Sequence, residues 1–199
     1  MDMKRIAVVV GAALLVLWVL GKFVASSPHP NAASAASTNA DQPITADRWV
    51  VKEDKSPMDD SRTVVLSLES EDVIQGPLGA KRPSLIIRCQ EGKTDTYVVT
   101  RMAASVEEDY DGGPRLDHTV KIRFDDGNAI EERWDESGAH DALFIGADGK
   151  EFVRTLAHTQ RLTFQFTPFN ANPAIARFDL RGLDAHLGRV ADACRWTSN

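Results

Sequence analysis

The chain has 199 residues, a formal net charge of -6 and an isoelectric point near 5.4. This balance argues against nucleic acid or anionic lipid heads as partners, because both require a clustered positive field. Hydrophobic residues make up 43% and charged residues 26%, as in a protein that folds around a core.

Residues 1–25 have the pattern of a membrane-targeting segment. Lys4 and Arg5 precede an uncharged run from Ile6 to Leu20. Positive charges before an apolar run hold that end in the cytoplasm and send the following chain across the membrane. The run alone has the length of a signal-peptide core, and its continuation to Ala25 gives the roughly 20 residues that span a bilayer. Two outcomes remain open: an uncleaved anchor in the inner membrane with a periplasmic C-terminal domain, or a soluble periplasmic protein after signal cleavage.

Residues 26–46 are small, polar and proline-containing, which predicts a flexible tether. The folded domain is expected over residues 47–199. Trp49, with the two valines that follow it, begins the first segment after the apolar run that can bury substantial area. A single domain of about 150 residues is large enough to enclose a sizeable core.

Beyond Trp49, apolar residues recur mostly at every second position, which is typical of strands with one face in a core. The alternating runs are 64–68, 85–89, 120–124 and 162–166. Glu91-Gly92 is a turn signal between the run that ends at Cys89 and a further strand over 94–101. The sequence therefore predicts a hairpin there, with Cys89 pointing into the core.

A second hairpin is predicted around an Asp-Asp-Gly segment. The apolar residues before and after this segment share parity, so the connection must contain an odd number of residues if both sets face one side. A three-residue loop with Gly127 in the left-handed conformation meets this condition. It places Ile122 opposite Ile130 and Lys121 opposite Glu131.

The last part of the chain changes from strand to helix periodicity. A short strand is expected over 141–145, a helical turn or two over 150–158, and a last strand over 174–180. One apolar face at helical spacing then follows, formed by Leu183, Leu187, Val190, Ala191 and Cys194. The expected fold is mainly β, an antiparallel sandwich or partly open barrel, with a C-terminal amphipathic helix.

The two cysteines are Cys89 and Cys194. An exported chain folds where thiols oxidise, and an even count without CxxC spacing indicates one structural disulfide rather than a redox or zinc site. Both side chains are expected to face inward, so the bond would join the helix to the sheet.

The sequence predicts no enzyme active site, metal site or cofactor. HExxH and GxSxG are absent, and the histidines are scattered. Asp117-His118 and His140-Asp141 could hold a proton or a metal, but adjacent pairs of this kind are common on surfaces. Turn chemistry explains acidic clusters such as Asp125-Asp126 without a calcium site.

In order along the domain, the residues resemble the TagO/VasI family of type VI secretion-associated periplasmic proteins. The matching pieces are Trp49, SPMDDSRTVVLSLES at 56–70, LIIRCQEGKTDTYVV at 85–99, VKIRFDD at 120–126, LTFQFTPFNANPAIARFDLRGL at 162–183, and Ala193-Cys194-Arg195-Trp196. The resemblance implies an exported accessory protein with a β-rich domain closed by a helix and a disulfide, from a family without an established enzymatic activity.

The first functional hypothesis is therefore a membrane-tethered periplasmic module that binds a protein partner in the cell envelope. Its partner surface is expected around Arg88, Arg123, Asp125 and Trp134. Two alternatives remain: an immunity-type inhibitor that binds an incoming effector, and a periplasmic hydrolase that uses a carboxylate or a histidine site at His118 or His140.

Overall fold

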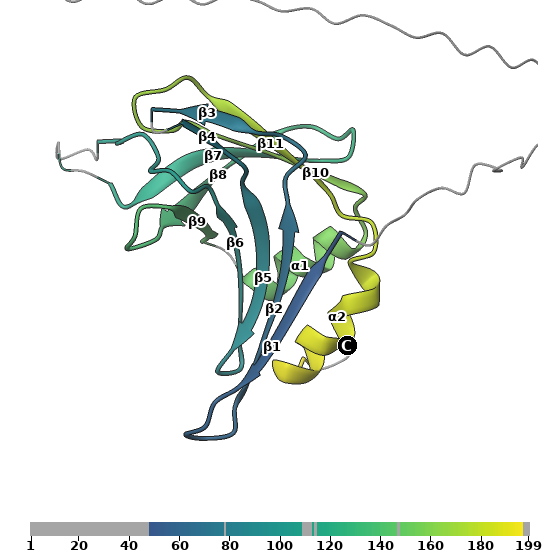
Figure 1. Ribbon diagram of the computed structural model, residues 1–199. Coiled ribbons are helices and arrows are strands. Elements are labelled where there is room, and N and C mark those ends of the chain that lie inside the picture. Colours follow the sequence, from purple (N-terminus) through teal and green to yellow (C-terminus); the bar gives the residue numbers. More distant parts are fainter. Residues whose placement is uncertain (1–47, 78, 109–112, 114, 147, 197–199) are drawn as a thin grey trace, which may run out of the picture. The chain divides into compact units, whose positions relative to one another are not determined.

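A computed structural model describes residues 48–77, 79–108, 113, 115–146 and 148–196 (Figure 1). The predicted membrane segment, 1–25, and the predicted tether, 26–46, lie outside the described residues. Among the helices that are described, none is both long enough and apolar enough to cross a membrane.

Most strands of the described residues belong to one antiparallel sheet of nine strands, in the order β1-β2-β5-β6-β9-β8-β7-β10-β11. Its strands are β1 (Val50–Lys55), β2 (Arg62–Glu69), β5 (Ser84–Gln90), β6 (Lys93–Val99), β7 (Asp117–Phe124), β8 (Ile130–Glu136), β9 (Ala142–Ile145), β10 (Arg161–Phe166) and β11 (Ala174–Asp179). A separate pair is formed by β3 (Ile74–Gly76) and β4 (Gly79–Lys81). The predicted mainly β, antiparallel fold is confirmed, and the long strands share one continuous sheet.

The sheet bends so that its two ends approach each other. In Figure 1, β1, β2, β5 and β6 run across the direction of β7, β8, β10 and β11. The Glu71 N–H donates to the carbonyl oxygen of Arg177 at 2.8 Å, which joins the end of β2 to β11 at the far end of the strand order. This main-chain hydrogen bond therefore stabilises the strong curvature of the sheet.

Two helices occur in the described part of the chain: α1 (Gly149–Ala157) and α2 (Asp184–Ala193). α1 begins after Asp148, whose side chain accepts a hydrogen bond from the Lys150 N–H at 2.9 Å, as an N-cap does. α1 packs against β6, and α2 packs against β2 and β5. The predicted C-terminal helix is confirmed, with Val190 fully buried on its inner face.

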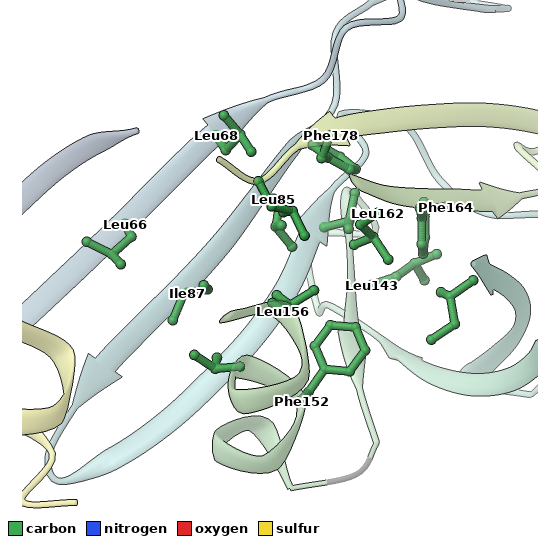
Figure 2. Packing of buried hydrophobic residues seen from close by; sticks show 14 of the residues in the cluster. Leu66, Leu68, Leu85, Ile87, Leu143, Phe152, Leu156, Leu162, Phe164 and Phe178 are labelled. Carbon is green, nitrogen blue, oxygen red and sulfur yellow. The ribbon is translucent and has the colours of Figure 1, made fainter. Parts of the chain in front are cut away.

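Alternate residues of the strands fill the core, as the period of two predicted. Figure 2 shows side chains of β2 and β5, such as Leu66 and Ile87, in one cluster with Leu156 of α1 and Phe178 of β11. Trp134 lies at the centre of the aromatic part, 5.7 Å from the Phe152 ring centroid and edge-on to it. The core is thus shared between both halves of the sheet and α1.

The hairpin from β7 to β8 confirms the predicted register but not the predicted loop. Ile122 pairs with Ile130 as expected. However, β7 ends at Phe124 and β8 begins at Ile130, so five residues connect them. The left-handed residue is Asp125, with φ 47°, and not Gly127. The reason is tertiary: the Asp125 Oδ1 accepts hydrogen bonds from two successive backbone N–H groups, at residues 160 and 161, which draws the turn toward β10.

The predicted disulfide between Cys89 and Cys194 is confirmed. Their Cα atoms are 5.6 Å apart, within the range that a disulfide spans, and both side chains are buried. The bond joins β5 to the end of α2, so the C-terminal helix is covalently fixed to the sheet.

Candidate functional site

The outer surface of β7, β10 and β11 carries a row of charged side chains. Arg123 pairs with Thr163, and Thr163 pairs with Arg177 across the three strands. The neighbouring row, which contains Phe164, is buried because successive side chains of a strand point to opposite faces. We call this outer surface the charged face; its residues are Lys121, Arg123, Arg161, Thr163, Gln165, Ile175 and Arg177.

Two cations of the charged face are already paired with acidic side chains: Lys121 lies 2.8 Å from Glu131, and Arg177 binds Asp72. The Arg177 Nε and Nη2 donate to the two carboxylate oxygens of Asp72 at 3.0 and 2.5 Å, and the Arg177 backbone N–H also donates to Asp72 at 2.8 Å. This guanidinium holds the pKa of Asp72 below its usual range, against the effect of burial. Arg177 therefore serves to fix the segment after β2 onto β11.

Two other cations of the charged face lack such neutralisation. Among the described residues, no group accepts a hydrogen bond from the Arg161 guanidinium. Arg123 reaches only the fully exposed Asp126, at 3.5 Å, which is the outer limit of a hydrogen bond, and an exposed ion pair of this kind contributes little. Beside them the apolar Ile175 is 47% exposed. An open depression of about 360 Å³ is lined by these residues together with Asp125, Thr163 and Arg177, so two carboxylates, of Asp125 and Asp126, lie beside the arginines. This part of the face can pair with carboxylates of another molecule.

The four residues predicted for a partner surface are not brought together. Arg123 and Asp125 are neighbours at the charged face, although one Asp125 oxygen is used to hold the adjacent hairpin. Arg88 lies on β5, where it donates to Asp95 at 2.8 Å and stands 5.4 Å from the Tyr97 ring centroid. In the strand order, β5 is separated from β7 by three strands.

The prediction that Trp134 belongs to a partner surface is wrong. Its side chain is fully buried, and its indole N–H donates to Glu132 at 2.9 Å. On β8 the parity that sets Arg133 outward turns Trp134 toward the rings of Phe152 and Phe164. It is a core residue.

Two histidines that are far apart in sequence meet on one carboxylate. The His140 Nδ1 lies 2.6 Å from the Glu136 Oε2, and the His118 Nε2 lies 3.5 Å from the same oxygen. Burial alone would raise the pKa of Glu136, but hydrogen bonds from His140 and from the Ala104 N–H outweigh it and lower the pKa. Within the described residues, no serine, threonine or cysteine side chain hydrogen-bonds to either histidine, and no group of three metal-binding side chains is placed to hold an ion.

A second polar cluster surrounds Arg133. Its guanidinium donates to Asp117 at 2.9 and 3.0 Å and also contacts Glu107. Together with Arg115, it holds the pKa of the Asp117 carboxyl far below its usual range. The cluster ties the segment that precedes β7 to β8. The sequence prediction missed it, although the predicted register already places Thr119 opposite Arg133 and hence Asp117 on a diagonal to it.

Comparison with known proteins gives one family. The family model described as "Type VI secretion system VasI, EvfG, VC_A0118" matches residues 23–196. No curated protein sequence matches the chain. A solved structure, titled as the crystal structure of invasion associated protein b from Bartonella henselae, is similar with a TM-score of 0.49 at 12% identity, covering 74% of this chain and 93% of that chain.

Proposed function

Because this chain belongs to the VasI family of type VI secretion proteins, we propose that it is a non-enzymatic accessory protein that binds a protein partner through the charged face. The observation that carries the proposal is the pair of exposed guanidinium groups at Arg123 and Arg161, beside the exposed apolar side chain of Ile175. Arginine is enriched in protein interfaces, where it pairs with carboxylates of the partner.

The proposal places the domain in the periplasm, with residues 1–25 as an anchor in the inner membrane. The disulfide between Cys89 and Cys194 supports this location, since structural disulfides persist in oxidising compartments and are rare in the cytoplasm. The partner would then be a protein of the cell envelope that reaches the outer surface of β7, β10 and β11.

The test uses charge reversal and crosslinking in the native host. A photo-crosslinking amino acid at Thr163, in the middle of the charged face, should capture one defined protein. The double substitution Arg123→Glu and Arg161→Glu should lower that crosslink about tenfold and lower type VI secretion in parallel. Arg154→Glu is the matched control, because Arg154 is a half-exposed arginine on α1, and it should change neither.

The outcomes separate the hypotheses. Capture of a component of the secretion apparatus supports the accessory role, whereas capture of an incoming effector protein supports the immunity-type alternative. Normal secretion together with an unchanged crosslink in the double variant would contradict a role for the charged face.

The hydrolase alternative has one observation in its favour, the meeting of His118 and His140 on Glu136. The same contacts have a structural explanation, because they tie the turn at residues 137–140 to β7 and β8. If the cluster is structural, Glu136→Gln should lower the thermal midpoint while secretion per folded molecule stays at the wild-type level. A normal midpoint with lost secretion would favour catalysis.

A further inference from the structure

A small apolar pocket lies apart from the charged face, next to the β3–β4 pair. It is formed by three segments: the β3–β4 hairpin, the turn after β6 and the turn after β10. The lining residues are Gly76, Pro77, Gly79, Lys81, Arg101, Met102, Ala103, Phe169 and Asn170. Figure 1 shows β3 and β4 near β11, at the end of the domain away from α2. We call this site the apolar pocket.

The walls of the apolar pocket are fixed by main-chain contacts. The Phe169 N–H donates to the carbonyl oxygen of Ala103 at 2.9 Å, and Ala104 forms a β-bridge with Pro168, so two of the walls are held together. The Met102 side chain closes the third side. Its Sδ and Cε lie 3.2 Å from the point where a Cβ would stand on Gly76, so the absence of a side chain at that position brings Met102 against the hairpin.

The size of the apolar pocket limits what it can bind. Its volume of about 270 Å³ is just under the range of roughly 300 to 1,000 Å³ that is typical of sites for whole small molecules. It fits one or two apolar side chains, not a cofactor or a diacyl lipid. Phe169 is 45% exposed, which leaves apolar surface that a bound side chain would cover.

The charges at the apolar pocket all have the same sign. Its charged lining residues are Lys81 and Arg101. The Arg101 guanidinium is held by neutral acceptors, the carbonyl oxygen of Arg82 at 3.0 Å and the Ser84 hydroxyl at 3.1 Å. Among the described residues, no carboxylate pairs with the Lys81 ammonium. In a chain with a net charge of -6, this local positive charge favours an anionic group next to the apolar one.

From this combination we propose that the apolar pocket binds a segment of a partner protein in which an apolar side chain stands beside a carboxylate. The apolar side chain enters between Met102 and Phe169, and the carboxylate pairs with Lys81. This site is separate from the charged face, so the proposal goes beyond the proposed function and does not depend on it.

The test uses methionine methyl groups of the full-length protein as reporters. The chain has four methionines, and two of them lie in the described domain: Met102 in the apolar pocket and Met58, which is 91% exposed in the β1–β2 turn. With 13C-methyl methionine labelling, the peptide acetyl-Ala-Leu-Phe-Asp-amide should shift the Met102 signal in a saturable way and leave the Met58 signal unchanged. The matched peptide with Asn in place of Asp should bind about fivefold more weakly.

Substitutions at two lysines, the half-buried Lys81 and the exposed Lys52, check the charge. Lys81→Glu should weaken the Asp peptide about fivefold or more, whereas Lys52→Glu, at an exposed position on the edge strand β1, should leave it unchanged. Phe169→Ser should weaken both peptides, because it removes apolar surface without a change in charge. The dispersion of the amide spectrum confirms that each variant is folded.

Three results would overturn the proposal. The first is no saturable shift of Met102 with either peptide in the folded wild-type protein. The second is equal binding of the Asp and Asn peptides with no effect of Lys81→Glu, which would leave an apolar pocket without charge selection. The third is binding of sodium octanoate, used as a fatty-acid probe, in the absence of peptide binding, which would indicate a site for a lipid tail.

Discussion

Removal of the Cys89–Cys194 bond should cost a large part of the stability of the domain. The bond closes a loop with a sequence separation of 105 residues. In the chain-entropy model, a loop of this length loses about 16 cal/mol/K in the unfolded state, or about 4.8 kcal/mol at 25 °C. A domain of ordinary stability has about 5 to 15 kcal/mol in total, so the loss is a third or more of it.

The residue that replaces each cysteine affects the result, because both sulfur atoms are buried. Cys89 is fully buried, and Cys194 is 7% exposed, between β5 and α2. Serine at these positions would bury hydroxyl groups without certain partners and add a separate cost. The double variant Cys89→Ala and Cys194→Ala avoids this cost, and the reduced wild-type protein removes the bond without any substitution.

Urea unfolding followed by tryptophan fluorescence measures the effect. With a slope of about 2 kcal/mol/M, a loss of about 4.8 kcal/mol lowers the midpoint by about 2.4 M. The reduced protein and the double alanine variant should agree within about 1 kcal/mol, since they share the loss of the cross-link. A loss below about 1 kcal/mol in both would refute the reasoning that the bond acts on the unfolded chain. Free thiols at these positions in protein isolated from the envelope would contradict the proposed compartment.

Three further predictions concern the core, a helix terminus and a surface carboxylate. Gly149→Ala should lower the free energy of unfolding by about 2 kcal/mol, because a Cβ there would lie 2.5 Å from the Thr94 carbonyl oxygen. Gly188→Ala, where a Cβ would have nothing within 4 Å, should raise the free energy of unfolding by about 1 kcal/mol. Changes of the urea midpoint in the same direction for both variants would contradict this. The depressed pKa of Asp117 means that its contribution to stability is complete above the unfolded pKa of about 3.9 and is lost as the pH falls below it. Asp117→Asn should therefore lower the free energy of unfolding at pH 7. The loss of stability between about pH 4 and pH 2, measured by urea titrations, should also be smaller in this variant than in the wild-type protein. An unchanged pH profile would show that the arginine partners of Asp117 do not contribute to stability. Trp134→Phe should lower stability by about 1 to 3 kcal/mol in the same assay and leave crosslinking at the charged face unchanged; a lost crosslink at normal stability would contradict its burial.

Local patterns in the sequence predicted most of the long strands, the C-terminal helix and the pairing within two hairpins, β5–β6 and β7–β8. They did not predict the β3–β4 pair or the order of strands in the large sheet. Alternation placed the strands, and shared parity gave the register of Ile122 with Ile130. These features depend only on the period of two and on the turn between neighbouring strands. The predicted loop length was wrong because the Asp125 side chain accepts a hydrogen bond from the backbone just before β10, which is a contact between segments 35 residues apart.

The candidate site was less predictable, because its contacts join segments that are distant in the chain. His118 and His140 looked like separate surface pairs, and only the β7–β8 and β8–β9 pairings bring both to Glu136. The predicted partner surface included Trp134, although the sequence also fits a core or domain-edge position for this residue. The sequence indicated the burial of Trp134, because Trp134 shares the parity of Ile122, which is buried. Arg161 is not part of a recognisable sequence motif. It is a candidate for partner binding because no acceptor for its guanidinium is found among the described residues.

The edges of the sheet indicate how a partner can bind. An exposed edge strand can add a strand of another chain through its unpaired backbone groups. On β11 the backbone N–H and carbonyl of Arg177 are already bonded to the Asp72 side chain and the Glu71 N–H.

The opposite edge, β1, carries a run of four charged residues from Lys52 to Lys55, and Arg189 of α2 pairs with Glu53 there at 2.9 Å. Charged edge strands oppose pairing with another sheet. With the middle of one edge occupied and the other charged, strand addition is disfavoured at both. Under the proposals for the charged face and the apolar pocket, recognition depends on side chains and not on backbone pairing at a sheet edge. Substitutions that change a side chain but keep the backbone, such as Arg161→Glu and Lys81→Glu, are therefore the decisive ones.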